Sequence, residues 1–161
     1  MPTRWTITPS HDEMAFLLEA GIIYRDAKNF QAARDVFTGA KVLIPEHEIP
    51  EVFLGTVDFQ EGNFDAAEGH YRKALELNPR SAFAYAHLGE ACLFRKDKEA
   101  ARTHLANAIA LDPLGESGKM ARRLMMMLPA SLIGTRNLSF RAQPSTYSDT
   151  RNASAPSSPY S

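Results

Sequence analysis

Histidine and cysteine are the side chains in this sequence best suited to ligate a metal or to act as a nucleophile. Five histidines and one cysteine occur. A metal site needs convergent ligands, but no two histidines have a paired ligand spacing on one helix face. We therefore predict structural or surface roles for all five, and no cofactor. They are His11, His47, His70, His87 and His104.

Cys92 is the lone cysteine, and it lies in an apolar stretch with Leu88 and Leu93. A thiol in such a stretch packs as a small hydrophobe far more often than it attacks a substrate. The sequence also lacks a glycine-rich phosphate-binding loop. We therefore predict that the protein is not an enzyme.

The elements that must position these side chains follow a period of 34 residues. Such a period is typical of two antiparallel helices that stack on the next pair. Proline ends the second helix of each pair because it cannot continue the hydrogen-bond ladder. The recurring residues are Pro45, Pro79 and Pro113; Gly21, Gly55 and Gly89; Ala33, Ala67 and Ala101; and Ala40, Ala74 and Ala108.

This pattern resembles the tetratricopeptide repeat over roughly two thirds of the chain. The resemblance implies an all-α fold of three tandem helix-turn-helix units in a right-handed superhelix, over 14–47, 48–81 and 82–115. A capping helix over 116–128 should cover the last unit. A segment over 1–13 precedes the units, and a tail over 129–161, rich in serine and proline, is predicted to be disordered. The stripe expected on the capping helix is Met120, Leu124, Met127 and Leu128.

Local signals refine this picture. Ser10 and Glu13 have the spacing of a capping box, which predicts a helix start at Ser10. Pro50 suits the first turn of another helix. Glu51 and Asp58 stand where the family usually has aromatic residues. Asp58 either faces solvent or has a hydrogen-bond partner, and the sequence leaves both alternatives open.

Composition narrows the classes of partner. The net charge is −1, so no strong field favours nucleic acid or an anionic membrane. No apolar stretch approaches the length of a bilayer span, and no secretory signal is recognisable at the N-terminus. A lone cysteine fits a reducing compartment. We therefore expect a cytoplasmic protein with another protein as its partner.

The concave surface is the predicted binding site. In this family the first helix of each unit lines the inner face, and here the implied positions are unusually apolar. Large apolar side chains favour burial, so a partner segment should cover them. Arg25 and Glu90 are expected to tune selectivity at the edges. The predicted contact residues are Ile22, Val52, Phe53, Phe59, Phe83, His87, Leu93 and Phe94.

Two other occupants of this groove remain open. The chain's own segment 5–7 could fill it, or two copies of the chain could form a homodimer through it. Cochaperones of this family hold acidic C-termini with a clamp of lysine, asparagine and basic residues. That clamp is absent, because its positions hold Leu18, Ile22, Phe53, Phe83 and His87.

A further resemblance is to the class II chaperones of bacterial type III secretion. These are three-repeat proteins of about this size whose groove holds hydrophobic translocator segments. The resemblance implies a chaperone or adaptor that shields an apolar client segment. The alternative prediction is a structural assembly subunit that binds through its convex face or its tail.

Overall fold

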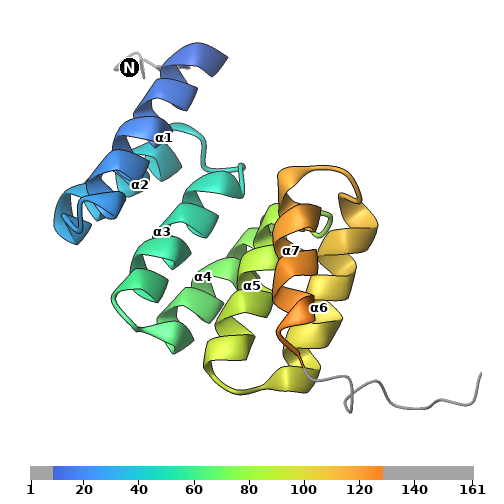
Figure 1. Cartoon of the computed structure of the whole chain (residues 1–161). Coiled ribbons are helices and arrows are strands. Elements are labelled where there is room, and N and C mark those ends of the chain that lie inside the picture. The colour runs from blue at the N-terminus through green and yellow to red at the C-terminus, as the bar shows by residue number, and fades with distance from the viewer. Residues whose placement is uncertain (1–8, 129–161) are drawn as a thin grey trace, which may run out of the picture.

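The computed structural model describes residues 9–128, and it forms seven α-helices arranged as a stack of helix pairs (Figure 1). The predicted all-α repeat fold is confirmed. The predicted tail and the segment 5–7 lie outside the described residues. The helices are α1 (His11–Asp26), α2 (Phe30–Leu43), α3 (Ile49–Gln60), α4 (Phe64–Leu77), α5 (Ala82–Phe94), α6 (Lys98–Leu111) and α7 (Glu116–Met126).

The recurring glycines explain how the two helices of a pair approach each other. A Cβ atom added at Gly55 would overlap the ring of Tyr71, and one at Gly21 would overlap the ring of Phe37. At Gly89 the added atom would lie 2.6 Å from Cγ of Leu105. In each pair the first helix therefore leaves a gap that one bulky side chain of the second helix fills.

The first helix begins as the sequence predicts. The Ser10 N–H donates to Oε2 of Glu13 at 2.8 Å, and the Glu13 N–H donates to Oγ of Ser10 at 3.2 Å. This reciprocal pair is a complete capping box. Pro50 lies in the first turn of α3, where its missing N–H breaks no helical hydrogen bond.

The core is continuous along the stack and consists largely of the recurring small residues and of one bulky side chain from each helix pair. All six recurring alanines are fully buried, as are the side chains of Phe37, Tyr71 and Leu105. Small residues let the helix axes approach closely, so the bulky side chains can fill the remaining space. The six alanines are Ala33, Ala40, Ala67, Ala74, Ala101 and Ala108.

The capping helix covers the end of the stack, but its buried face differs from the predicted stripe. Ala121 and Leu128 are buried in one cluster with Leu105 of α6. Met120 and Leu124 pack against that cluster, whereas Met127 is 74% exposed. Helix α7 ends at Met126, so the last two predicted residues follow the helix.

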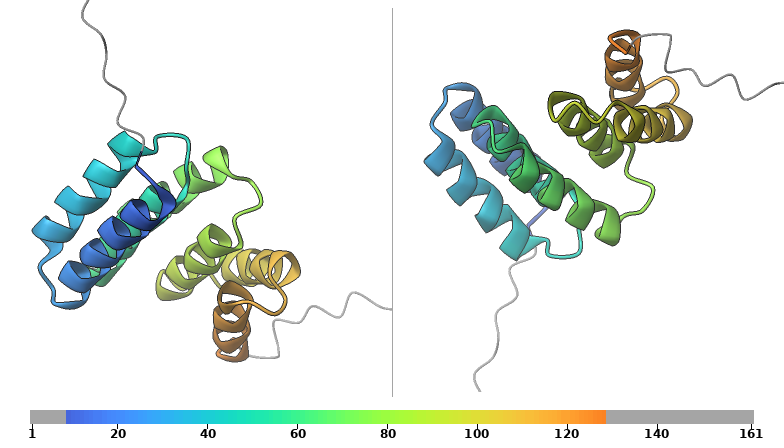
Figure 2. Two further views of the ribbon diagram at one scale, coloured as in Figure 1. Left: turned by 90° about the horizontal axis from the view of Figure 1, so that it is seen from above. Right: turned by 90° about the horizontal axis from the view of Figure 1, so that it is seen from below.

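The first helix of each pair and α7 form one side of the stack. Contacts join α1 to α3, α3 to α5 and α5 to α7, so these four helices follow one another along the molecule. The helix axes rotate from the N-terminal pair to α7, which gives the stack a superhelical shape (Figure 2). None of the helices in residues 9–128 has the length and apolarity needed to cross a membrane.

Candidate functional site

Aromatic rings gather on α3 and α5 in two groups, and the first group lies toward the N-terminal ends of these helices. Phe53 stacks on the buried Phe37, with ring centroids 5.0 Å apart. Phe83 meets Phe53 edge-on at 5.6 Å and His87 edge-on at 4.8 Å. We call Phe37, Phe53, Phe83 and His87 the first ring cluster. Its members cover one another, so each predicted contact residue in it is only half-buried.

The second ring cluster consists of Phe59, Phe64 and Phe94, near the C-terminal ends of α3 and α5. The Phe59 ring lies 4.9 Å from the Phe94 ring and 5.2 Å from the Phe64 ring, with both contacts edge-on. Phe94 is 56% exposed, which makes it the most accessible of the predicted ring contacts. This cluster therefore offers apolar surface to solvent.

The remaining predicted contact residues divide into surface and core. Ile22 and Leu93 are half-buried. Val52 is fully buried in a core cluster with Tyr71 and Leu88. Val52 thus differs from the prediction, because the helix register that places it on the inner face also places it against α4 and α5. A bound segment could not reach Val52 without a change in the core.

A pocket of about 250 Å³, lined by charged, polar and apolar side chains, lies between the two ring clusters, with His87 of the first and Phe59 of the second in its lining. Side chains from five helices line it, which places it at the centre of the concave face. Arg25 and Glu90, predicted at the edges of the groove, lie in this central pocket instead, together with His87. The lining residues are Arg25, Thr56, Phe59, Gln60, Tyr71, His87, Glu90 and Met120.

Hydrogen bonds fix most polar groups of the pocket. The Arg25 guanidinium donates to Oγ1 of Thr56 at 3.0 Å and pairs with Asp26 at 2.8 Å. The Thr56 hydroxyl in turn donates to the Phe53 carbonyl at 2.7 Å. His87 Nδ1 lies 3.2 Å from Oε2 of Glu90. The lining of the pocket therefore holds one cation, Arg25, and one carboxylate, Glu90, each with a partner of its own.

Tyr71 is the exception among these groups. Its side chain is fully buried, and its hydroxyl has no hydrogen-bond partner among the described residues. Burial raises the pKa of Tyr71, and the charges of Glu90 and Asp58 raise it further, while Arg25 opposes them. The hydroxyl therefore remains protonated and keeps a proton to donate. Tyr71 is not among the binding residues predicted from the sequence, although it is the only one of the bulky core residues Phe37, Tyr71 and Leu105 that carries a hydroxyl.

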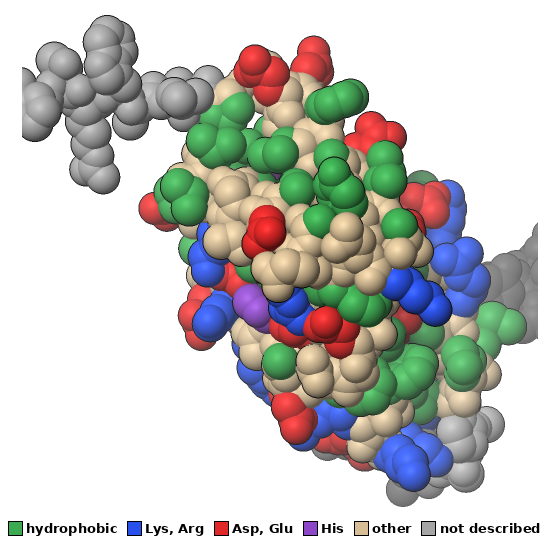
Figure 3. Space-filling view, turned by 90° about the vertical axis from the view of Figure 1, so that its left-hand side faces the viewer, with side chains coloured by type: hydrophobic (Ala, Val, Ile, Leu, Met, Phe, Trp, Pro, Cys, Tyr) green, Lys and Arg blue, Asp and Glu red, His purple; other side chains and the backbone are tan. Residues whose placement is uncertain are grey.

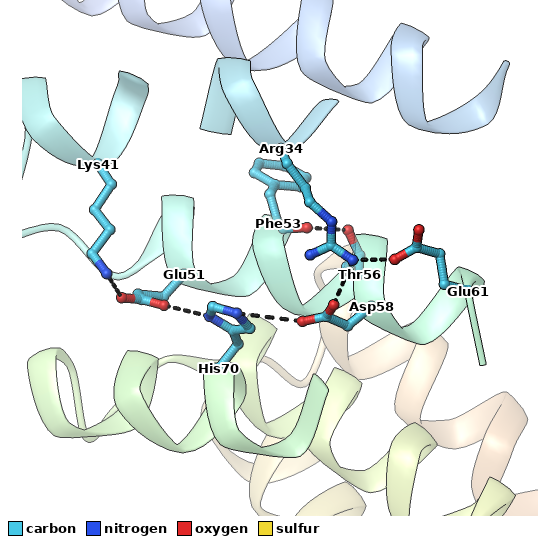
Figure 4. A network of polar contacts seen from close by, with 8 residues as sticks. All are labelled: Arg34, Lys41, Glu51, Phe53, Thr56, Asp58, Glu61 and His70. Atoms are coloured by element: carbon cyan, nitrogen blue, oxygen red, sulfur yellow. Dashed lines mark hydrogen bonds and ion pairs between the residues drawn. The ribbon is translucent and has the colours of Figure 1, made fainter. Parts of the chain in front are cut away.

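The question left open for Asp58 is settled by a buried polar network between α2, α3 and α4 (Figure 4). Arg34 NH2 lies 2.6 Å from Oδ1 of Asp58 and also pairs with Glu61. His70 bridges two carboxylates, with Nδ1 at 2.7 Å from Glu51 and Nε2 at 3.3 Å from Asp58. Asp58 has partners within the protein. His70 therefore has a structural role here.

Cys92 also has a structural role. It is 1% exposed and packs in the central core cluster. Burial raises the pKa of its thiol, and the charges of Glu68 and Asp97 raise it further. A raised pKa lowers the thiolate fraction, and the thiolate is the nucleophile. Within residues 9–128, no group of three or more histidine, cysteine or acidic side chains could hold a metal ion.

Comparison with known structures supports the fold. The SycD chaperone of Yersinia enterocolitica, a type III secretion translocator chaperone, has 20% identity and a TM-score of 0.64, over 74% of this chain and 90% of that one. PcrH in complex with the chaperone-binding region of PopB has 21% identity and a TM-score of 0.62, over 74% and 98%. The first repeat domain of Spaghetti (RPAP3), bound to an HSP90 peptide, has 22% identity and a TM-score of 0.60, over 76% and 98%.

The family profile described as tetratricopeptide repeat matches residues 58–124. That range runs from the end of α3 into α7, and the 34-residue spacing extends the same pattern through α1 and α2. The family match shows tetratricopeptide repeats over residues 58–124, and the stacked helix pairs and the similar structures show that residues 9–128 have the fold of such repeats.

Proposed function

We propose that the concave face binds an apolar segment of another protein, and that the protein acts as a cytoplasmic chaperone or adaptor without catalysis. The observation that carries the proposal is the pair of ring clusters on α3 and α5. Phe94, at the exposed end of the second cluster, is 56% exposed. A bound segment would cover it together with Phe59 and Leu93.

The energetics favour a short apolar client. Burying one large apolar side chain fully contributes roughly 1.5–3 kcal/mol. The rings of both clusters are already partly covered by one another, so each offers only part of that gain. Several contacts along the groove must therefore act together, with Ile22, Phe53 and Phe83 extending the surface from the second cluster. An extended or amphipathic segment fits that requirement.

The residues of the first ring cluster favour an apolar, secretion-related client over an acidic C-terminus. SycD has been solved with a peptide of the translocator YopD, and PcrH with a segment of PopB. The RPAP3 domain carries an acidic HSP90 peptide instead. In this chain Phe53, Phe83 and His87 form an aromatic cluster at positions where a carboxylate clamp needs amide and basic groups. We propose a type III secretion-like chaperone role on this basis.

A single exposed ring provides the cleanest test. Phe94→Ser removes apolar surface from the groove and leaves the buried core intact, so the melting temperature should change little. Proteins captured by the wild type from an extract of the source cells should fall about tenfold, as for a binding hot spot. Quantitative mass spectrometry of the captured proteins measures this loss.

The matched control is Val42→Ser, which removes a side chain that is 75% exposed on α2, outside the groove. It should retain the captured proteins. Equal capture by wild type and Phe94→Ser would show that partners bind elsewhere.

A second candidate, a structural assembly subunit, is favoured by an apolar surface outside the groove. Phe16 is 76% exposed and Ile23 is 62% exposed, both on α1 at the N-terminal end of the stack. Hydrophobic side chains gather where α1 and α2 lie, above a belt of charged side chains (Figure 3). A fixed partner or a second copy of the chain could cover this face. Phe16→Glu would release such a partner, whereas a groove client would stay bound.

A further inference from the structure

We infer that the central pocket accepts a carboxamide side chain, asparagine or glutamine, from the bound segment. This inference rests on the proposed function and deepens it, because it states which side chain the groove recognises between two apolar stretches. The pocket lies between the first and second ring clusters, and α1, α3, α4, α5 and α7 all line it. A segment that spans both clusters must therefore cross it.

The Tyr71 hydroxyl is a polar group of the pocket's lining that still needs a hydrogen-bond partner. The side chain is fully buried, and the hydroxyl has no partner among residues 9–128. A buried hydroxyl without a hydrogen bond costs free energy, so such groups in folded proteins are nearly always paired. The neighbouring Thr56 hydroxyl already donates to the Phe53 carbonyl. A ligand with a hydrogen-bond donor and an acceptor would supply the missing partner for Tyr71.

The charges in the pocket select a neutral ligand. A carboxylate would meet Arg25 favourably but would be repelled by Glu90, with Asp26 and Asp58 nearby as further negative charges. An ammonium or guanidinium group would meet Glu90 favourably but would be repelled by Arg25. A carboxamide avoids both conflicts because its oxygen accepts hydrogen bonds and its NH2 group donates them.

The walls fit the stem of such a side chain. Phe59 and Met120 are the apolar side chains of the lining and can pack against methylene groups. The Tyr71 hydroxyl has almost no exposed surface, so an incoming group must displace part of the lining. Met120 has an unbranched, adaptable side chain, which makes it the natural element to move.

The test is a selection from a phage-displayed library of random 12-residue peptides on the full chain. Tyr71→Phe is the matched variant, because it keeps the ring against Gly55 and removes only the hydroxyl oxygen. The wild type should enrich peptides with asparagine or glutamine flanked by apolar residues. Tyr71→Phe should enrich the apolar residues without the amide. Tyr85→Phe, a half-buried tyrosine outside the pocket, should behave as the wild type does.

A synthetic peptide from the wild-type selection then quantifies the effect by calorimetry. Replacing its amide residue by methionine should weaken binding to the wild type about tenfold, and to Tyr71→Phe less than twofold. Enrichment of apolar peptides without an amide preference would overturn the pocket inference and leave the groove proposal standing. Enrichment of a charged residue at that position would also overturn it. No enrichment by any of the proteins would overturn the groove proposal itself.

Discussion

At the scale of single residues, the second repeat replaces two expected aromatic side chains with carboxylates. Glu51 and Asp58 lie on one side of α3 and are 3% and 5% exposed. Buried carboxylates are costly unless they are paired, and His70, Lys41 and Arg34 provide the partners. Each carboxylate has a cation of its own, Lys41 for Glu51 and Arg34 for Asp58, and the two share His70. The carboxylates and their basic partners therefore act as one unit.

This network should make the fold sensitive to acid. Burial alone would raise the pKa of Glu51, but hydrogen bonds and charges from Lys41 and His70 outweigh it and lower the pKa below 4.5. The pKa of Glu68 is lowered in the same way by Arg72 and Arg95. A lowered pKa in the folded state contributes stability above the ordinary value, and that contribution is lost as the pH falls through the folded pKa.

We therefore predict that the free energy of unfolding decreases as the pH falls below about 4.5. Glu51→Gln should lose roughly 2–3 kcal/mol at pH 7, because a buried charged hydrogen bond disappears, and should show a weaker dependence on acid. Urea unfolding between pH 7 and pH 3 measures both quantities. The exposed Glu76→Gln variant serves as the control and should follow the wild type. An unchanged acid dependence in Glu51→Gln would contradict the prediction.

At the scale of helices, an ion pair joins each repeat to the next, and the cation and the carboxylate exchange places from the first junction to the second. Arg34 of α2 pairs with Glu61, which follows α3. One repeat later, the equivalent positions hold Glu68 of α4 and Arg95, which follows α5, and these also pair. Because the sign alternates, a helix pair shifted by one repeat would place like charges together. The pairs therefore favour the observed order of the helix pairs over a shifted one.

The turn inside each helix pair requires a left-handed residue, and two of the three turns use an unfavourable one. Lys28 has φ 61° and Lys96 has φ 66°, whereas the equivalent Gly62 has φ 83°. Left-handed backbone costs a residue with a side chain about 1–2 kcal/mol, and glycine avoids that cost. The turns themselves are alike. In each, the next N–H donates to a carbonyl five residues earlier, as Asn63 does to Asp58 at 2.9 Å.

We predict that Lys28→Gly and Lys96→Gly each raise the free energy of unfolding by about 0.5–1 kcal/mol, after the greater freedom of glycine in the unfolded chain is subtracted. Gly62→Lys should lower it by about 1 kcal/mol. Shifts of the urea midpoint at constant slope measure these changes. Gly69→Ala is the control for helix propensity. Gly69 lies inside α4 with open space around it, so this variant changes the propensity of a helix without changing a turn. Destabilisation by both lysine replacements would show that the side chains stabilise the turns by other means.

At the scale of the whole molecule, the fold was more predictable than the binding site. The 34-residue spacing predicted the helix pairs because each glycine and bulky residue, such as Gly55 and Tyr71, repeats one packing contact. The pocket could not be predicted, because Tyr71 occupies the same core position as Phe37 and Leu105. Its hydroxyl matters only beside Arg25 and Glu90, which come from other repeats. Which side chains of different repeats lie close together depends on the superhelical geometry, and the 34-residue spacing alone does not determine that geometry.

The end of the stack should limit the stability of the whole. Each helix pair buries its apolar face only against a neighbour, so the last pair depends on α7. Deletion of 116–161 would remove Ala121, Leu124 and Leu128 and expose Leu105 and Ala108, which they cover. We predict a loss of about 2–3 kcal/mol and a melting temperature lower by roughly 8–13 °C.

Deletion of 129–161 alone is the matched control, because it keeps α7 and Leu128 in place. Circular dichroism melts of the two truncated chains make the comparison. The shorter deletion should keep the wild-type melting temperature and the longer one should lower it. Since Met120 of α7 also lines the central pocket, the longer deletion should weaken binding of a groove peptide at temperatures where the chain is still folded. Equal melting temperatures for the two would mean that the third repeat is stable without a cap, and that α7 serves the groove alone.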